Sequence, residues 1–277
     1  MRERNEPDKG GLAMQKKMQS NKLVQIGLMV SVLLMSSTVF SHSVLWDTSH
    51  GVAGGGSYQP SGYYQTLVQH LGNNGFTVDT TSDGFLVDDP ADYDVIVVCL
   101  ASAFDTAYTS GEASEVERIL SFVNNGGGLL LMGDIHTSPN ANIQPVADEF
   151  GIILGVSSVT PLHLYTSNLS DHPIFDGISQ IYMYAAGELT ASSPASAAAW
   201  AEGTGEAIAA VAEDDPGRVV VLGDVSLWAT DTTWDYFHKA NNPQFSVNTF
   251  EYLAIPEPAT VLLLGLGSLM LLRRRRI

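Results

Sequence analysis

The stretch SVLWDTSHG, residues 43–51, decides the fold. It reads as a short apolar strand that ends in the carboxylate of Asp47, with His50 in the loop that follows. Two later stretches repeat this design: GLLLMGD at residues 128–134 and VVVLGD at residues 219–224 are apolar runs that each close with Gly-Asp. Unbroken apolar runs separated by helical patterns are typical of a parallel sheet that is covered on both faces.

The three aspartates that close these runs are expected to lie together. Parallel strands end at the same edge of their sheet, and ligands of open α/β sheets bind outside that edge. The sequence therefore predicts that Asp47, Asp134 and Asp224 are brought to one rim of the sheet.

The rest of the body gives a coarse α/β pattern. Further strands are predicted at residues 76–78, 93–100 and 162–165, and an antiparallel pair at residues 207–212 and 218–222 around the turn Asp-Asp-Pro-Gly. Helices are predicted at residues 62–71, 116–123, 143–150 and 245–253 from the spacing of their apolar side chains. Residues 185–203, rich in alanine and serine, give no clear assignment.

The body is strongly acidic. Residues 42–255 hold 26 acidic residues against three basic ones (Arg118, Arg218 and Lys239), which gives a net charge of −23. A body without a basic stripe cannot neutralise phosphates, so nucleic acid is excluded as a partner. The single cysteine, Cys99, lies inside an apolar run, which rules out a disulfide within the chain and favours a small buried side chain.

The N-terminal segment is predicted to be an export signal. Residues 1–13 are polar, and three lysines, Lys16, Lys17 and Lys22, precede an apolar run at residues 23–40. This order, with a cut before His42, predicts a secretory signal peptide read by the Sec machinery. The alternative is an N-terminal anchor that is retained.

The C-terminal segment has three parts: Pro256-Glu257-Pro258, an apolar stretch at residues 259–272, and four arginines at residues 273–276. This arrangement resembles the PEP-CTERM sorting signal of Gram-negative bacteria. The resemblance implies processing by exosortase, transient anchoring in the inner membrane by a C-terminal transmembrane helix, and an envelope or extracellular location tied to exopolysaccharide. We therefore divide the chain into a start and signal peptide (1–41), an α/β domain (42–254) and the sorting signal (255–277).

Four motifs of the body together resemble the class I glutamine amidotransferase-like superfamily, in particular its DUF4350-type and ThuA-like branches. They are D-x-x-H-G at residues 47–51, the helix and strand of residues 116–134, Asp-His-Pro-Ile at residues 171–174, and G-D-x-S at residues 223–226. The resemblance implies a flavodoxin-like fold, a parallel sheet between layers of helices. True amidotransferases carry a cysteine on the turn after the strand that corresponds to residues 129–133. Here that turn reads Gly-Asp-Ile-His, which argues against glutamine hydrolysis.

Five residues near the predicted rim are candidates for chemistry. Asp47, His50 and Asp134 are the candidate catalytic residues, and His136 and Asp224 are candidate ligand-binding residues. Such a set of carboxylates and imidazoles suits acid–base catalysis on a sugar. It also suits the binding of a divalent cation such as Mn, Zn, Ca or Mg. The alternative is that each aspartate caps a helix or braces a loop.

Two further ligand-binding candidates lie outside these motifs. His172 precedes a proline, where a rigid turn is the competing interpretation. Trp228, followed by Trp234, Tyr236 and Phe237, is a candidate stacking face for a sugar, although such a loop can also pack into the core.

Three hypotheses follow for an exported protein of this kind. The first is a non-catalytic module that binds a carbohydrate such as envelope polysaccharide, or another small ligand, at the carboxyl edge of the sheet. The second is a carbohydrate hydrolase or lyase that uses Asp47, His50 and Asp134, with or without a metal ion. The third is a protein-interaction scaffold at the cell surface that needs no pocket.

Overall fold

The structure, a computed structural model, describes residues 41–51, 57–100, 108–111, 113–214 and 216–254. The chain divides into two units, Met1–Phe40 and Ser41–Ile277. The predicted signal peptide and sorting signal lie outside the described residues, and the predicted domain limits stay predictions. Among the helices that are described, none combines the length and the apolar character needed to cross a membrane.

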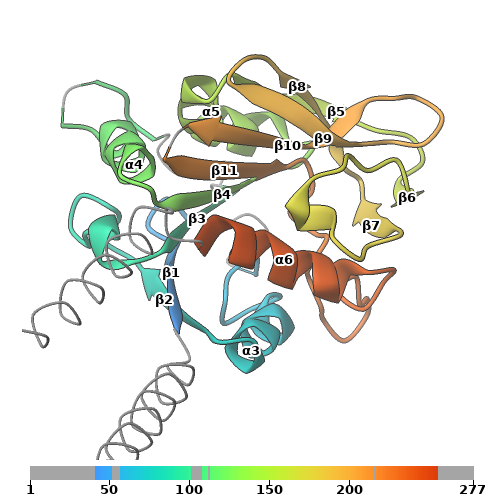
Figure 1. Cartoon of the computed structure of the whole chain (residues 1–277), viewed down its shortest axis with the longest axis horizontal. Helices are drawn as coiled ribbons and strands as arrows, with labels where there is room; N and C mark the ends of the chain where they lie inside the picture. The colour runs from blue at the N-terminus through green and yellow to red at the C-terminus, as the bar shows by residue number, and fades with distance from the viewer. Residues whose placement is uncertain (1–40, 52–56, 101–107, 112, 215, 255–277) are drawn as a thin grey trace, which may run out of the picture. The chain divides into compact units, whose positions relative to one another are not determined.

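The described elements alternate between strands and helices over the first half of the body and are mostly strands afterwards (Figure 1). In chain order they are β1 (His42–Asp47), α3 (Gln65–Asn73), β2 (Phe76–Thr81), η1 (Pro90–Asp92), β3 (Val95–Cys99), α4 (Glu115–Asn124), β4 (Gly128–Met132), α5 (Thr137–Glu149), β5 (Ile152–Ser158), β6 (His163–Thr166), η2 (Pro173–Phe175), β7 (Ile181–Tyr184), β8 (Gly187–Ala191), β9 (Ala195–Trp200), β10 (Ala207–Asp214), β11 (Gly217–Leu222) and α6 (Asn242–Ala254).

A mixed sheet of nine described strands forms the centre of the domain. Its main path runs β2-β1-β3-β4-β11-β10-β8-β5, and β9 pairs with β10 off that path. The pairs β1–β2, β1–β3, β3–β4 and β4–β11 are parallel, as the apolar runs predict. The predicted antiparallel pair is confirmed as β10–β11, and antiparallel pairing continues through β8 and β5. The sheet is therefore mostly parallel near β1 and antiparallel at its other end.

Helices cover both faces of the parallel part. Helices α3 and α6 contact each other on one face, and α4 and α5 contact each other on the other (Figure 1). Helix α4 shows why such a helix forms: Ser114 caps it by accepting from the backbone N–H of Glu117 at 3.2 Å, and its apolar stripe, which includes Ile119 and Val123, is fully buried. The central strands β3 and β4 are buried along their whole length, all five residues of each.

Several segments differ from the sequence prediction, and among them strands β5 and β7 were not predicted. Helix α5 begins at Thr137, six residues before the predicted start, and continues through Pro145. The unassigned residues 185–203 contain β8 and the alanine-rich β9. Alanine favours helices, but here the small side chains of β9 pack against β10, where Ala197 lies opposite Ala210. Tertiary pairing therefore overrides the local propensity.

A second sheet, the antiparallel pair β6–β7, is held to the body through Asn242 at the start of α6. The fully buried Asn242 amide accepts from the backbone N–H of Tyr182 at 3.0 Å. It donates to the backbone carbonyls of Tyr182 and Leu227, each at 2.9 Å. One side chain thus joins α6, β7 and the segment after β11.

We predict that Asn242→Ala lowers the free energy of unfolding by about 2–3 kcal/mol, because it leaves buried backbone groups without partners. The measurement is denaturant unfolding followed by circular dichroism. The matched control is Gln244→Ala on the exposed side of the same helix, for which we expect a change below about 0.5 kcal/mol. Equal effects of the two substitutions would show that Asn242 does not anchor β7.

Candidate functional site

The three aspartates do lie at the carboxyl edge of the parallel strands, but they form two groups. Asp47 is the last residue of β1, whereas Asp134 and Asp224 each come two residues after the neighbouring strands β4 and β11. Strand β3 lies between β1 and β4, so Asp47 and Asp134 are separated by two strand spacings, about 9–10 Å.

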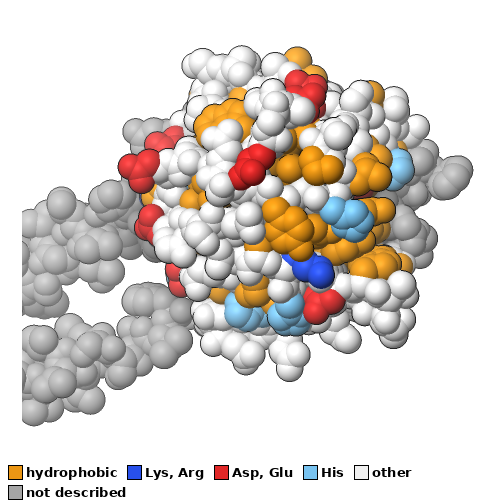
Figure 2. Space-filling view, turned by 90° about the vertical axis from the view of Figure 1, so that its right-hand side faces the viewer, with side chains coloured by type: hydrophobic (Ala, Val, Ile, Leu, Met, Phe, Trp, Pro, Cys, Tyr) orange, Lys and Arg blue, Asp and Glu red, His pale blue; other side chains and the backbone are white. Residues whose placement is uncertain are grey.

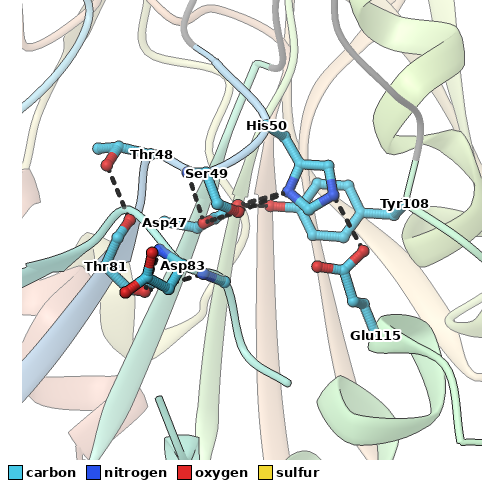
Figure 3. A network of polar contacts seen from close by, with 9 residues as sticks. Asp47, Thr48, Ser49, His50, Thr81, Asp83, Tyr108 and Glu115 are labelled. Carbon is cyan, nitrogen blue, oxygen red and sulfur yellow. Dashed lines mark hydrogen bonds and ion pairs between the residues drawn. The ribbon is translucent and has the colours of Figure 1, made fainter. Parts of the chain in front are cut away.

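The first group is built around Asp47 (Figure 3). Its Oδ1 accepts from the backbone N–H and the hydroxyl of Ser49, at 2.9 and 2.7 Å. Its Oδ2 accepts from the Nδ1–H of His50 at 3.0 Å and from the hydroxyl of Tyr108. Asp47 is 3% exposed, so these bonds replace the water that the carboxylate loses on burial.

His50 lies between two carboxylates. Its Nε2–H donates to Oε2 of Glu115 at 2.9 Å, while Nδ1–H donates to Asp47. The ring also stacks on Tyr108, with centroids 3.9 Å apart and planes inclined by 17°. Glu115 is the first residue of α4, so the network joins the loop after β1 to a helix that is 65 residues further along the chain.

The electrostatics of this network follow from its contacts. Burial alone would lower the pKa of His50, but the hydrogen bonds and charges of Asp47 and Glu115 raise that pKa to about 9. Burial alone would raise the pKa of Asp47, yet the hydrogen bonds from His50, Tyr108 and Ser49 lower it. At neutral pH the network is a protonated imidazole held between two carboxylates, and both ring nitrogens are occupied.

Asp134 belongs to the second group. Burial raises the pKa of Asp134, although a hydrogen bond of 2.6 Å from the backbone N–H of Ile135 acts in the opposite direction. Its own backbone is fixed by the Asn140 side chain, which accepts from the Asp134 N–H at 3.0 Å and donates to the carbonyl of Gly155 at 2.7 Å. His136, the residue before α5, is exposed, and its side chain makes no capping hydrogen bond.

Asp224 is fully buried, and its carboxylate accepts hydrogen bonds from the backbone around it. Its Oδ2 accepts from the N–H of Tyr184 at the end of β7, and its Oδ1 accepts from the N–H of Ser226, both at 2.6 Å. Burial and the charge of Asp134 raise its pKa well above the ordinary value. The hydroxyl of Ser226 lies 3.1 Å from that of Tyr58, whose pKa burial raises to about 12. Through its bonds to Tyr184 and Ser226, Asp224 connects the end of β7 to the loop after β11.

Two of the predicted ligand-binding residues are not placed where a ligand at this rim could use them. The His172 ring packs edge-on against Tyr252 of α6, and its pKa, lowered by burial, is also affected by the charges of Glu213 and Arg218. Arg218 is at the start of β11, so His172 lies toward the opposite edge of the sheet from Asp224. Trp228 is fully buried against Phe245 and Phe250 of α6, so the loop packs it into the core instead of presenting it to a sugar.

The predicted cation set does not fit a metal ion. His50 has no free lone pair because both ring nitrogens donate to carboxylates, and Asp224 has no exposed surface. In the part of the chain that is described, no three His, Cys, Asp or Glu side chains come together in a group that could hold a metal.

The single cysteine is also not in a position to act as the nucleophile of an amidotransferase. Cys99 ends β3, not β4, and its sulfur lies 3.6 Å from the hydroxyl of Tyr64. Burial raises the pKa of its thiol to about 12. A thiol with that pKa is not a nucleophile at neutral pH.

A pocket of about 480 Å³ is formed by β6, β7 and the loop that follows β11. We call it the aromatic pocket; it is lined by His163, Tyr165, Tyr182, Thr233, Trp234, Asp235, Tyr236 and Lys239. Figure 2 shows this side of the domain, where hydrophobic side chains gather around a histidine with an acidic and a basic side chain beside them.

Sequence reasoning named Trp234 and Tyr236 but missed the part of the aromatic pocket that comes from β6 and β7. It also missed Tyr108 and Glu115 of the first group. The spacing of His163 with Tyr165, and of Tyr182 with Tyr184 outside the pocket, is the period-two signal that marks one face of a strand. No comparable signal relates Glu115 to His50, because 65 residues separate them.

Comparison with known proteins identifies the C-terminal end of the chain. The family model described as the PEP-CTERM protein-sorting motif matches residues 254–276. The segment is a PEP-CTERM sorting motif. A PEP-CTERM protein is exported, anchored transiently in the membrane through its C-terminal region and processed by exosortase. Among curated proteins, none matches the chain.

Solved structures identify the fold of the body. The chain is similar to the mmIFT52 N-terminal domain (TM-score 0.63, 16% identity, covering 77% of this chain and 98% of that one). It is also similar to cytoplasmic protein STM3548 from Salmonella typhimurium (0.52, 16%, 76% and 98%). A third similar structure is a ThuA-like protein from Bacteroides uniformis ATCC 8492 (0.50, 14%, 76% and 90%). The body of the chain therefore has the predicted flavodoxin-like α/β fold, a largely parallel sheet between layers of helices.

We predict that the protein loses stability as the pH rises from about 6.5 to 9. His50 has a pKa of about 9 when folded and 6.5 when unfolded, so its contribution is complete below pH 6.5 and is lost as the pH passes the folded value. The shift corresponds to a decrease of roughly 2–3 kcal/mol in the free energy of unfolding. The contribution of Asp47 has the opposite sign: it is present above the ordinary pKa of 3.8 and is lost as the pH falls below that value.

The measurement is urea unfolding at pH 6 and pH 9. His50→Gln removes the titrating group, so we expect a lower stability at both pH values and a smaller difference between them. The control His238→Gln removes an exposed histidine and keeps the wild-type difference. The same pH dependence in wild type and His50→Gln would contradict the assignment of a protonated His50.

Proposed function

We propose that the body of this exported protein is a non-catalytic module that binds carbohydrate in the aromatic pocket, at the carboxyl end of β11. The observation that carries the proposal is the pocket itself. Its volume of about 480 Å³ lies in the range of small-molecule sites, roughly 300–1,000 Å³. It combines aromatic rings with hydroxyl, carboxylate and ammonium groups, which suits a ligand that has apolar ring faces and many hydroxyls.

The polar groups of the pocket can hydrogen-bond a sugar. Lys239 is exposed, and no ion pair involving it occurs among the described residues. The Asp235 carboxylate accepts from the Nδ1–H of His238 at 2.8 Å and is half exposed, so it retains acceptor capacity. Trp234 is partly exposed and supplies a large ring with a polar N–H.

The network around Asp47 supports binding in preference to catalysis. A general acid or base needs a pKa near the working pH and an accessible nitrogen or oxygen. His50 is 6% exposed, holds its proton with a pKa of about 9 and donates both N–H groups inside the protein. A hydrolase or lyase that used Asp47 and His50 would first have to break this network. The thiol of Cys99, buried at the end of β3, likewise offers no support for glutamine hydrolysis.

Export supports a ligand outside the cytoplasm. A sorted protein whose body contains an aromatic pocket could attach to envelope or extracellular polysaccharide through that pocket. A rim closed by Trp228 and Trp234 would favour the scaffold hypothesis. Trp228 is packed into the core, but Trp234 lines an open pocket, which favours ligand binding over the scaffold.

We predict that Trp234→Ala lowers the affinity for a bound oligosaccharide on the order of tenfold, because it removes the largest ring of the pocket; tenfold corresponds to about 1.4 kcal/mol. A glycan array identifies ligands of the wild-type body, and calorimetric titration measures the affinity of each variant. The same titrations with product analysis should show that the glycan is bound and not cleaved.

The control variants are Tyr93→Ala, a partly exposed tyrosine just before β3 at the other edge of the sheet, and His50→Gln. We expect both to bind like wild type. Loss of binding in His50→Gln with normal binding in Trp234→Ala would place the ligand at the Asp47 network and overturn the proposal, as would turnover of the bound glycan.

A further inference from the structure

The pairing of β6 with β7 sorts their side chains onto two faces. His163 lies opposite Tyr184 and Tyr165 lies opposite Tyr182, whereas Leu164 lies opposite Met183. Leu164 and Met183 are buried, so this face is the one that packs on the body. The other face consists of four rings, three of which line the aromatic pocket. Its rings range from the buried Tyr182 to Tyr165, which is 43% exposed.

The rings of this face continue into the loop after β11. Tyr165 lies 4.8 Å from Tyr182, measured between ring centroids, and Tyr182 lies 5.6 Å from Tyr236. Tyr236 stacks with Trp234 at 5.2 Å and an angle of 14°. The Trp234 ring then meets Tyr63, outside the pocket and just before α3, edge-on at 4.7 Å.

These five rings form one unbroken series of contacts, which we call the aromatic strip. It consists of Tyr165, Tyr182, Tyr236, Trp234 and Tyr63. The four consecutive contacts, 4.7 to 5.6 Å between centroids, connect rings from β6, β7, the loop after β11 and the segment before α3. Tyr182, 1% exposed, is the buried member that joins Tyr165 to Tyr236. A single sugar ring would cover only part of such a strip.

The charge of the pocket restricts the ligand further. Lys239 and Asp235 are its only lysine, arginine, aspartate or glutamate residues, and their charges cancel. The body around them carries a net charge of −23 between residues 42 and 255, from 26 acidic and three basic residues. An acidic polymer would be repelled along its length and would meet one cation. An uncharged polymer has no such cost.

We propose that the aromatic strip is an extended site for several consecutive units of an uncharged polysaccharide chain. This inference rests on the proposed function and adds the length and the charge class of the ligand. In this arrangement Trp234 holds a central unit in the pocket. Tyr165 and Tyr63, at the two ends of the strip, contact units on either side, so affinity increases with the length of the oligomer.

The experiment measures the affinity of the full body for two sets of probes, each from one to six units long. The uncharged set contains β-1,4-linked glucose, N-acetylglucosamine and mannose oligomers, and the acidic set contains galacturonate and mannuronate oligomers. We expect at least one uncharged series to bind, with an affinity gain of about tenfold or more between one and four units. We expect the acidic series of equal length to bind more weakly.

Variants at the ends of the aromatic strip test its extent. Tyr63→Ala should reduce the gain from one to four units while leaving the affinity for the shortest bound oligomer within about twofold, because Tyr63 lies outside the pocket. Tyr165→Ala, at a residue that also lines the pocket, should likewise reduce the gain. The matched control is Leu162→Ala, an exposed apolar residue just before β6 that does not line the pocket. It should keep the full gain. Thermal melts confirm that each variant is folded.

Three outcomes would overturn the inference. If one unit binds as tightly as four, in a manner sensitive to Trp234→Ala, the site is a closed monosaccharide pocket and the proposed function still stands. If the acidic series binds more tightly than the uncharged one, the charge class is wrong. If no probe of either set binds, both the extended site and the proposed carbohydrate binding are rejected.

Discussion

A buried carboxylate at the end of a strand must find hydrogen-bond donors inside the protein, and this constraint determines how the carboxyl edge of the sheet is built. Asp47 obtains its donors from Ser49, Tyr108 and a protonated His50. Asp224 obtains them from the backbone. Burying a charge without such partners would cost several kcal/mol. The carboxylates and the imidazole at this edge of the sheet therefore stabilise the loops around them through hydrogen bonds.

The way each carboxylate is satisfied has consequences for the neighbouring structure. The His50 imidazole links the loop after β1 to the first turn of α4 through its hydrogen bond to Glu115. The helix dipole also stabilises the negative charge of Glu115 at this position. Asp224 links the end of β7 to the loop that carries Trp234. The two walls of the aromatic pocket are thus fixed to each other by a residue that no ligand could reach. Asp224 is a positioning residue for the pocket and not part of its lining.

The sequence predicted the parallel core well because its strands are buried on both faces and therefore appear as unbroken apolar runs. It also predicted the turn between β10 and β11, since Asp-Asp-Pro-Gly favours a reversal of the chain. It did not predict β9, because alanine carries no strand signal and the pairing with β10 is decided by tertiary contacts. The aspartates were placed at the correct edge, yet strand order, which the sequence does not give, separates Asp47 from Asp134.

Side-chain partners were harder to predict than strands. Trp228 and Trp234 lie in the same segment, and nothing in their spacing shows that the first enters the core while the second lines the pocket. The pairing of His50 with Glu115 depends on the position of α4, which only the folded chain reveals. His172 was expected at a site because of its motif, but its turn packs against the end of α6 near the start of β11.

We propose that the carboxyl edge is closed by its own network and that a ligand binds beside it, in the aromatic pocket. Nuclear magnetic resonance of the isotopically labelled body during titration with an uncharged oligosaccharide tests this claim most directly. We expect the signals of Trp234, Tyr165 and Lys239 to shift while those of His50 and Glu115 stay unchanged. Shifts confined to His50, Tyr108 and Glu115, with a silent Trp234, would contradict the account.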